Sequence, residues 1–579
     1  MATLHDPLPL PCGRTLPNRI MKSALSEGLG TADLAPGERL VRLYDRWGAG
    51  GFGLIVTGNV MIDRTQLGEP GNVAVTDERD LGALTRWAKA AKQGGAPVWM
   101  QVNHPGRQAN PLATRHRPVA PSAIAPGIPG MPTPRALTEA EIADLIQRFA
   151  TTARVAEAAG FDGVQIHGAH GYLVSQFLSP LSNRRTDDWG GDGPRRMRFA
   201  LEVVRSIRGA VGPGFAVGIK LNSADFQRGG FTEDESRAVL EALSTEGLDL
   251  IEISGGSYES PAMMGRPRAG ASTRAREAYF LEYAESVRRT VSGIPLAVTG
   301  GFRSRAAMSS AVESDACDVV GLGRPTAVQP TAAGELLTGR TDVLRPPVIS
   351  LGLRGRLARS GAMKSFDGAL DLQWHTDQLH RLGAGLDPDP TRSPWKTAAT
   401  MLRRNGFDAL RPRRGATGDP RDRDARKFAI LLWANRNVMN PTIRGLDRIG
   451  IRTTLATELE TTGRKSGLPR RVPVTVRFDE TGAWLICQHG KLSGWGSNIA
   501  ADPNVRVRKG TQWLTGIAEL RPDDDVVARA RSFAPLRMLA PLTAAGFAAL
   551  QTTPVSVRIT FTDKVSREPD RSRAVQSTA

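Results

Sequence analysis

Residues 163–192, which read GVQIHGAHGYLVSQFLSPLSNRRTDDWGGD, carry the pattern that decides the fold. The stretch opens as a short apolar strand and then places His167, His170 and Tyr172 within six residues. A buried parallel strand that ends in polar groups is typical of a (β/α)8 barrel, which presents its chemistry at the carboxyl ends of its strands. Two imidazoles can donate hydrogen bonds to an oxygen that gains negative charge, and a phenol can deliver a proton. This combination suits reduction of a carbon–carbon double bond conjugated to a carbonyl, but histidines that only cap a strand and a tyrosine in the core explain it equally well.

Further apolar runs follow one another along the chain, and helical patterns separate them. One helix is predicted over 138–159, where Thr138 and Glu141 have the spacing of a capping box. Strands that alternate with helices favour a parallel α/β barrel over an all-β domain. An open doubly wound sheet is the alternative, although no GxGxxG follows the first strand. The predicted strands are 18–24, 54–57, 97–102, 163–167, 215–220, 248–254, 294–299 and 317–321.

The length of 579 residues predicts two or three domains, and a hydrophobic fraction of 40% is enough to build cores for them. Cys12, Cys317 and Cys487 lie far apart and form no CxxC pair. This spacing argues against a disulfide framework, a zinc site and an iron–sulfur cluster, so we expect no metal and a reducing, cytoplasmic environment. The first residues lack a secretory signal pattern, and no apolar stretch approaches the roughly 20 residues that span a bilayer.

The net charge of +18 is concentrated in the last third of the chain. Residues 401–579 contain 31 Lys and Arg against 17 Asp and Glu, whereas residues 1–400 contain 45 against 41. Basic surfaces attract nucleic acid, anionic membranes or anionic ligands. A solvated arginine-rich surface is the simpler explanation. Neither an aromatic platform nor a reading motif accompanies the charge, so we expect no nucleic-acid partner.

Glycine-rich turns follow the last two predicted strands. Gly300 and Gly301 come after one strand, and residues 321–324, Gly-Leu-Gly-Arg, come after the next. Loops at these positions of a (β/α)8 barrel commonly bind a phosphate through backbone N–H groups, and Arg324 would add a charge-assisted hydrogen bond. One glycine pair is explained by a turn alone, but two pairs at the last two strands favour a phosphate site.

The segment HGAHGYLVSQFLSPLSNRRTDDWGG resembles the signature of the old yellow enzyme family, and further similarity extends from about residue 4 to 385. Members of that family are FMN-dependent ene-reductases on a (β/α)8 barrel. The resemblance implies an FMN cofactor, NAD(P)H as hydride donor and a small activated alkene or quinone as substrate. It also implies that His167 and His170 hold the substrate's carbonyl oxygen and that Tyr172 supplies the proton. Gln101 would bond the pyrimidine edge of the flavin, and the Lys220 charge beside that edge would stabilise the anionic reduced flavin and raise its potential.

The same resemblance implies further FMN contacts at Ala24, Ser26, Gly58, Gly301, Gly323 and Arg324, the last three around the phosphate. The chain departs from the family at residues 23–26, Ser-Ala-Leu-Ser, where Ser-Pro-Met followed by Thr or Cys is usual. Ser26 would lie near the flavin O4 and N5 atoms. A serine hydroxyl can still donate a hydrogen bond, so we expect FMN binding to survive with an altered potential.

Residues 386–424 are dominated by Pro, Gly, Asp and Arg, and their apolar periodicity fades. This composition predicts a linker between a first domain at 1–385 and a second domain at 425–565, with a flexible tail at 566–579. The second domain is predicted to begin with a helix over 425–445. Short β runs broken by Gly, Asp and Pro follow it and indicate a small β-barrel.

Residues 461–467, TTGRKSG, form a polar turn with two cations between two predicted strands. Such a turn suits a phosphate, although charged hairpin turns are common and the glycine spacing is not that of a P-loop. The stretches TTGRKSGLPRRVPV and HGKLSGWGSNIAADPNVRV are similar to the deazaflavin-dependent nitroreductase family over about residues 430–562. That family consists of split β-barrels that bind a deazaflavin coenzyme with an acidic, phosphate-bearing tail. The implied coenzyme contacts are Arg464, Lys465, Ser466, Gly467, Trp495 and Asn498, with Arg470 as a neighbour.

The second domain departs from that family because the last tyrosine of the chain is Tyr283. Members that reduce nitro compounds or quinones are expected to use tyrosines near the coenzyme. The favoured hypothesis is a two-domain oxidoreductase in which NAD(P)H or a reduced deazaflavin reduces FMN in the barrel, and reduced FMN then reduces an activated alkene. The alternative is an ene- or quinone reductase whose second domain is a non-catalytic module for a ligand or partner. A homo-oligomer is compatible with the sequence.

Overall fold

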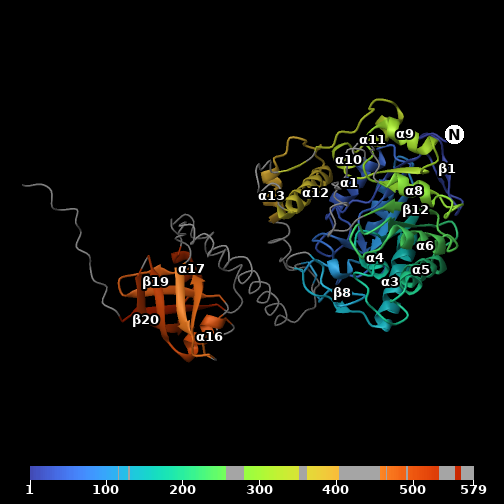
Figure 1. Ribbon diagram of the computed structural model, residues 1–579. Helices are drawn as coiled ribbons and strands as arrows, with labels where there is room; N and C mark the ends of the chain where they lie inside the picture. The colour runs from blue at the N-terminus through green and yellow to red at the C-terminus, as the bar shows by residue number, and fades with distance from the viewer. Residues whose placement is uncertain are drawn as a thin grey trace, which may run out of the picture. The chain divides into compact units, whose positions relative to one another are not determined.

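The computed structural model describes residues 1–402 except 112, 115, 128–130, 256–279, 348 and 351–360, and residues 457–562 except 465, 489, 491–492, 511 and 534–553. The chain divides into two compact units, 1–415 and 416–579, and each is described by itself (Figure 1). The helix predicted over 425–445, Lys465 and the tail predicted at 566–579 lie outside the described residues.

The first unit contains a closed barrel of eight parallel strands, which confirms the predicted (β/α)8 fold (Figure 1). Pairing runs from strand to strand around the barrel and closes where β10 pairs with β7, with Gly163 opposite Trp99. The barrel strands are β3 (Ile20–Lys22), β4 (Leu54–Val56), β7 (Val98–Asn103), β10 (Gly163–Gly168), β11 (Ala216–Asn222), β12 (Leu250–Ser254), β13 (Leu296–Thr299) and β14 (Val319–Leu322).

Alternate residues along each barrel strand face the interior and the surrounding helices. On β10, Val164 and Ile166 belong to the large apolar core beneath the helices, whereas His167 lines the cavity at the carboxyl end of the strand. The helices of the first unit are α1 (Glu38–Gly48), α2 (Leu81–Ala91), α3 (Glu139–Ala158), α4 (Leu173–Leu178), α5 (Gly193–Ala210), α6 (Glu233–Leu243), α8 (Leu281–Val287), α9 (Arg305–Glu313), α10 (Pro325–Val328), α11 (Ala332–Leu337), α12 (Gly361–Gly383) and α13 (Pro394–Leu402). Helix α3 begins with the predicted capping box, in which Thr138 Oγ1 accepts from the Glu141 N–H and the Glu141 carboxylate accepts from the Thr138 N–H.

Short strands complete the first unit. The antiparallel pair β1 (Leu8–Pro9) and β2 (Thr15–Leu16) places apolar side chains against the barrel interior at its amino-terminal end. There they join Met21, Trp99 and Val319 in a separate apolar cluster, which fills the barrel floor. The other short strands are β5 (Val60–Met61), β6 (Val73–Ala74), β8 (Val119–Ala120) and β9 (Arg135–Ala136).

Part of the range predicted as a linker is folded against the first unit. Helix α13 lies inside 386–424, and its Thr397 hydroxyl donates to the buried Asp377 carboxylate of α12 at 3.0 Å. Arg392 also pairs with Asp377 at 2.9 Å, and its carbonyl accepts from the indole of Trp374 at 2.9 Å. The composition of this range suggested a linker because few of its residues are apolar, whereas the contacts that hold it to α12 are polar. Residues 403–424 lie outside the described part of the chain.

The second unit contains an antiparallel sheet of seven strands in the order β16-β15-β19-β20-β21-β18-β17, which forms half of a barrel, as the sequence predicts. Alternating residues of these strands, among them Leu459, Leu485 and Val557, form its apolar core. The elements are β15 (Thr457–Thr462), β16 (Pro469–Val474), β17 (Arg477–Phe478), β18 (Gly482–Cys487), α16 (Gly494–Ala501), β19 (Asn504–Lys509), β20 (Gln512–Arg521), α17 (Val526–Ser532) and β21 (Val555–Phe561).

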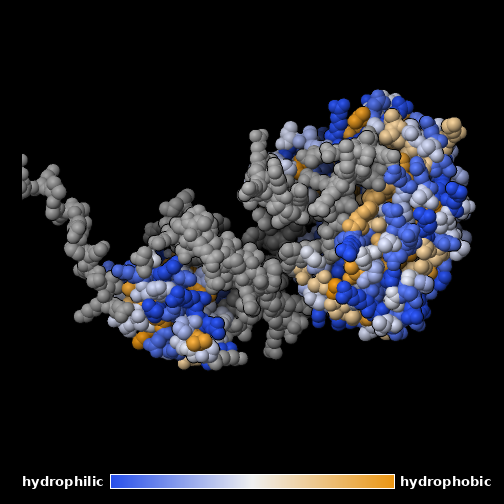
Figure 2. Space-filling model, viewed as in Figure 1, coloured by the Kyte–Doolittle hydropathy of each residue, from blue (hydrophilic) through white to orange (hydrophobic). Residues whose placement is uncertain are grey.

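The visible surface of each unit is mostly hydrophilic, with apolar side chains scattered among charged ones (Figure 2). Among the described helices, none combines the length and the apolar character that a membrane crossing requires.

Candidate active site

A cavity of about 700 Å³ opens at the carboxyl ends of the barrel strands. Its walls come from segments far apart in the sequence, because each strand of the barrel contributes the loop that follows it. Of the residues predicted to bind FMN or substrate, those that line it are Ala24, Ser26, Gln101, His167, His170, Tyr172, Lys220, Gly301, Gly323 and Arg324. Gly58 is the one predicted barrel-site residue that does not line it.

His167, His170 and Tyr172 meet at the cavity. The His167 ring lies edge-on to both neighbours, with ring centroids 5.1 Å from His170 and 4.7 Å from Tyr172. His167 lies near the end of β10, whereas His170 lies in the turn that follows, with a left-handed φ of 60°, and Tyr172 precedes α4. This turn carries the chain back across the end of its strand, so that the three side chains converge.

Both histidines are neutral at physiological pH. Burial lowers the pKa of His167 well below its ordinary value, and the nearby His170 and Lys220 lower it further. Burial also lowers the pKa of His170, with a smaller contribution from Lys220. His167 Nδ1 accepts from the Ala169 N–H at 3.3 Å, so the proton of the neutral ring is on Nε2. His167 therefore offers an N–H donor, and His170 Nε2 lies 3.0 Å from Ser254 Oγ.

A polar chain that the sequence did not reveal adjoins the Tyr172 hydroxyl. Asn59 Nδ2 donates to the Tyr172 hydroxyl at 3.4 Å and approaches Ser26 Oγ at 3.5 Å. Ser26 in turn donates to the carboxylate of Glu69, which also lines the cavity. Ser26 and Tyr172 therefore share Asn59 as a hydrogen-bond partner, and the Ser26 hydroxyl donates to an acceptor within the protein.

A second polar network lies in the barrel interior beneath the cavity. Gln101 Nε2 donates to Gln165 Oε1 at 2.7 Å, and Gln165 Nε2 donates to Glu252 Oε2 at 2.7 Å. The other oxygen of Glu252 lies 2.9 Å from the Lys220 ammonium. Gln101 and Lys220 were predicted, whereas Gln165 and Glu252 were missed. Strand parity could have found them, because each lies two residues before a cavity residue, His167 or Ser254, on the same strand.

The loops after β13 and β14 have the geometry expected of an anion site. Gly300 and Gly301 have φ values of 136° and 92°, which side-chain-bearing residues rarely adopt. At Gly323 an added Cβ would meet only Leu25 Cδ2, at 3.6 Å, so the backbone there lies open to the cavity. Arg324 pairs with Asp371 of α12 at 2.7 Å, a partner 47 residues away that the sequence did not indicate.

The protein around Gly58 leaves no room for a side chain at this position. Its N–H donates to the buried Glu27 carboxylate at 2.9 Å, and a Cβ at this position would collide with that carboxylate and with the Leu25 carbonyl. We expect Gly58→Ala to lower the free energy of unfolding by about 1–3 kcal/mol, as overpacking does. Chemical denaturation measures this, with Gly82→Ala as control, because a Cβ at Gly82 of α2 would meet nothing within 4 Å. Equal stability of the two variants would contradict the packing role.

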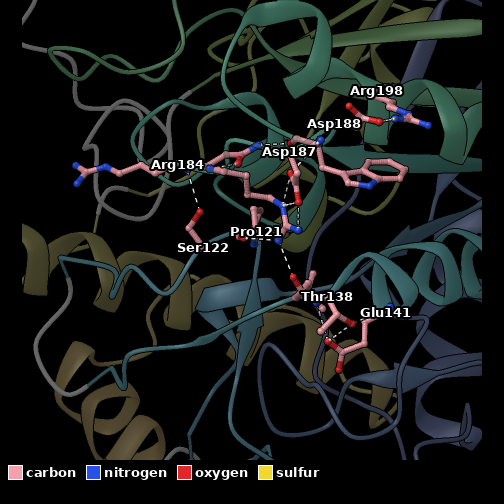
Figure 3. A network of polar contacts seen from close by, with 12 residues as sticks. Pro121, Ser122, Thr138, Glu141, Arg184, Asp187, Asp188 and Arg198 are labelled. Carbon is pink, nitrogen blue, oxygen red and sulfur yellow. Dashed lines mark hydrogen bonds and ion pairs between the residues drawn. The ribbon is translucent and has the colours of Figure 1, made fainter.

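The second half of residues 163–192 holds the loop that follows α4 (Figure 3). The Arg185 guanidinium pairs with Asp187 and donates to the carbonyls of Pro121 at 3.0 Å and Leu137 at 2.6 Å. The Arg184 N–H donates to Ser122 Oγ at 2.9 Å. The charged end of the signature is therefore structural, and only its first ten residues contribute side chains to the cavity.

Four histidines, three of them buried and His170 partly buried, predict that the protein loses stability as the pH falls below about 6.5. Burial lowers the pKa of His104 to about 4 and lowers those of His167, His170 and His375. The unfolded chain takes up these protons below about pH 6.5 whereas the folded protein does not, so each histidine costs about 1.4 kcal/mol per pH unit there. Burial raises the pKa of Glu27 and of Asp225, and their protonation offsets part of the loss. Urea unfolding at pH 7.5 and pH 5.5 checks the sign; equal or greater stability at pH 5.5 would contradict it.

In the second unit, the turn between β15 and β16 is held by α16. Asn498 of α16 is buried, accepts from the Arg464 N–H at 3.2 Å and donates to Thr461 Oγ1 at 3.0 Å. Gly467 has a φ of 64°, which turns the chain back into β16. The side chains of Arg464 and Ser466 are exposed, and Trp495 packs partly buried against the apolar core. The predicted turn at 461–467 therefore contacts the predicted segment that carries Trp495 and Asn498, through hydrogen bonds of Asn498. Lys465 lies outside the described residues.

Residues 3–342 match the NADH:flavin oxidoreductase / NADH oxidase family, and residues 442–557 match a family of quinone reductases that depend on the reduced deazaflavin coenzyme F-420. These matches confirm the predicted fusion of an old yellow enzyme-type barrel with a deazaflavin-dependent reductase domain.

Similar proteins extend this finding for the first unit. The chain is 40% identical over 354 residues to the NADH-dependent flavin oxidoreductase iliE of Hypocrea jecorina, a match that covers 57% of this chain and 88% of that protein. It is 34% identical over 333 residues to an NADH oxidase of Thermoanaerobacter brockii, a match that covers 57% of this chain and 50% of that protein.

Solved structures agree on the fold. Morphinone reductase superimposes with a TM-score of 0.51 at 26% identity, over 60% of this chain and 91% of that one. The old yellow enzyme homologue of Zymomonas mobilis, at 23% identity and a TM-score of 0.52, covers 60% of this chain and 95% of that one and shows the same fold. The chain therefore belongs to the NADH:flavin oxidoreductase / NADH oxidase family, and its barrel is an enzyme of the old yellow enzyme type.

Proposed function

We propose that the barrel binds FMN and reduces the carbon–carbon double bond of α,β-unsaturated carbonyl compounds. The observation that carries this proposal is the convergence of His167, His170 and Tyr172 on one cavity. Two neutral imidazoles beside a phenol offer hydrogen-bond donors for a carbonyl oxygen and a proton for the adjacent carbon.

The residues around the cavity fit FMN. A volume of about 700 Å³ lies within the range of about 300–1,000 Å³ that is typical of ligand sites. Gln101 and Lys220 offer an amide and a cation for the pyrimidine edge of a flavin, and the open backbone at Gly301 and Gly323, with Arg324, offers donors for a phosphate. When bound there, FMN would supply the transfer of a hydride from a nicotinamide to the β carbon of the alkene.

The side chains of the barrel supply binding, orientation and the proton. The Nε2–H of His167 binds the carbonyl oxygen of the substrate, which polarises the conjugated double bond. His170 lies beside it and is oriented by Ser254. The Tyr172 hydroxyl delivers its proton to the α carbon, and its hydrogen bond from Asn59 orients it for this transfer.

The proposed hydride donor is NADH, the donor in the names of several similar proteins, or a reduced deazaflavin bound by the second unit. The turn carrying Arg464 and Ser466 supports deazaflavin binding, because an exposed guanidinium and an exposed hydroxyl suit an acidic, phosphate-bearing tail. In this proposal the second unit supplies reducing equivalents to the barrel.

Anaerobic bleaching of the FMN absorbance tests the proposal. NADH, NADPH and reduced deazaflavin are added separately to the FMN-loaded chain, and an α,β-unsaturated ketone is then added to restore the absorbance. Rapid bleaching by the deazaflavin that is slowed in Arg464→Ala, but not in the exposed Arg477→Ala, supports one electron-transfer unit. Absorbance that no such ketone restores would contradict ene reduction.

One observation favours a second candidate function, in which the second unit is a non-catalytic module for a ligand or partner. The chain contains no tyrosine after Tyr283, so this unit lacks a phenol for substrate reduction. This candidate predicts bleaching by NADH or NADPH alone, with equal rates in the Arg464→Ala and Arg477→Ala variants.

A further inference from the structure

Lys220 does not present an isolated positive charge to the cavity. Its ammonium lies 2.9 Å from a carboxylate oxygen of Glu252, and the side chains of Lys220 and Glu252 are 4% and 0% exposed. Lys220 lies on β11 and Glu252 on β12, opposite each other in the strand register. Both side chains point into the barrel, but only Lys220 lines the cavity. The two groups form a buried ion pair directly beneath the open face of the site.

The other side chains that line this part of the cavity add no cation. Lys22 of β3 is a second buried cation in the barrel interior, but it does not line the cavity, and its ammonium donates to the Val56 carbonyl at 2.9 Å. Its charge acts on both Lys220 and Glu252 and is opposed by the buried Glu27. His167 and His170 are neutral, and Gln101 and Gln165 carry amides. The pair of Lys220 and Glu252 therefore has no net charge, and the field that Lys220 exerts on a ligand is opposed at close range by Glu252. The family resemblance implied a positive charge at Lys220 that favours an anionic reduced flavin, and the pairing with Glu252 changes the size of the effect that we expect.

Glu252 also fixes the direction of the amide chain. An ionised carboxylate can only accept hydrogen bonds, so Gln165 must turn its NH₂ group toward Glu252 and its oxygen toward Gln101. Gln101 must then give its NH₂ group to Gln165, which leaves its Oε1 as an acceptor at the cavity. The carboxylate thus determines, through two glutamines, that the site recognises an N–H donor at this point.

We propose that Glu252 is a positioning residue that sets the electron affinity of the bound flavin by opposing the charge of Lys220 and by orienting Gln101. The inference rests on the proposed function, since it needs FMN in this cavity. Its consequence is a reduced flavin that is a stronger hydride donor than an unopposed lysine would allow. That property suits a weakly activated alkene as the acceptor.

The test uses the full chain loaded with FMN and compares Glu252→Gln with the unchanged protein. Removal of the carboxylate charge leaves Lys220 unopposed by Glu252. The affinity for reduced FMN divided by the affinity for oxidised FMN should therefore be at least tenfold higher in Glu252→Gln than in the unchanged protein. For a two-electron couple this is a rise of about 30 mV in the midpoint potential, read by spectroelectrochemistry. The rate of flavin reduction by NADH should rise, and the rate of reoxidation by the alkene should fall. A local packing defect would not be expected to move the two half-reactions in opposite directions.

Two further variants make the result decisive. Glu241→Gln makes the same charge change at an exposed position on α6, and its potential should equal that of the unchanged protein. Lys220→Met combined with Glu252→Gln removes both charges without leaving either one buried alone. In this double variant, the ratio of the affinities for reduced and oxidised FMN should lie within threefold of the ratio in the unchanged protein. This double variant also keeps the test available if the single variant does not fold.

The outcomes separate this inference from the function on which it rests. Bound FMN whose potential is unchanged or lower in Glu252→Gln would overturn the role of Glu252 and leave the FMN site standing. A potential in the double variant as high as in Glu252→Gln would overturn it as well, because the effect would not depend on Lys220. A chain that takes up no FMN would overturn the proposed function itself.

Discussion

Replacing Tyr172 with phenylalanine should slow reoxidation of the reduced flavin by an α,β-unsaturated ketone by about 10²–10⁴-fold, the usual contribution of a positioned general acid. The ring is 5% exposed and packs 4.7 Å from the His167 ring, so phenylalanine keeps the packing and removes only the hydroxyl. Reduction of the flavin by NADH involves no proton from this group and should be unchanged. Anaerobic stopped-flow measurement of the two half-reactions checks both statements.

Tyr283→Phe is the matched control for Tyr172→Phe. Tyr283 is also buried, but it lies on α8 and does not line the cavity. Both half-reactions should therefore keep their rates in this variant. Equal rates of reoxidation in Tyr172→Phe and Tyr283→Phe would show that another group supplies the proton.

Replacing His167 with alanine should lower kcat/KM for the alkene by about 10²–10³-fold, the cost of removing one donor from a site that stabilises developing negative charge. The reason is the tautomer: the Ala169 N–H occupies Nδ1, so the lost group is the Nε2–H donor. His167→Asn keeps an N–H donor and should retain more activity than His167→Ala. Steady-state kinetics with FMN-saturated protein measure the three proteins side by side.

His116→Ala is the control for the histidine series, because His116 is exposed and does not line the cavity. Combining His167→Ala with His170→Ala should cost less than the product of the two single effects, since both side chains serve one oxygen. Full additivity of the two effects would indicate that the histidines act on different parts of the substrate.

The sequence predicted the barrel well because its strands are short, buried and apolar on the face toward the helices, as Val164 and Ile166 are on β10. It also predicted the residues that end these strands, since the carboxyl ends of parallel strands meet at one face. Local patterns were sufficient for both predictions.

The sequence could not predict which partners meet across the barrel. The contact of Lys220 with Glu252 depends on the register between β11 and β12, and the contact of Arg324 with Asp371 depends on how α12 packs after the barrel has closed. The family resemblance assigned Gly58 to the cofactor, whereas in the structure the buried Glu27 carboxylate leaves no room for a side chain at this position. Each of these features depends on residues distant in the sequence.

The left-handed backbone of His170 has a consequence for how the site can change in evolution. A φ of 60° is comfortable for glycine and costs a histidine roughly 1 kcal/mol or more. Since Gly171 also has a positive φ, of 75°, the turn would accept glycine at both positions. Glycine at position 170 would relieve this backbone strain, but it would remove the imidazole and its contact with Ser254. The persistence of histidine at this position in descendants of the chain would measure how strongly the reaction depends on the second imidazole.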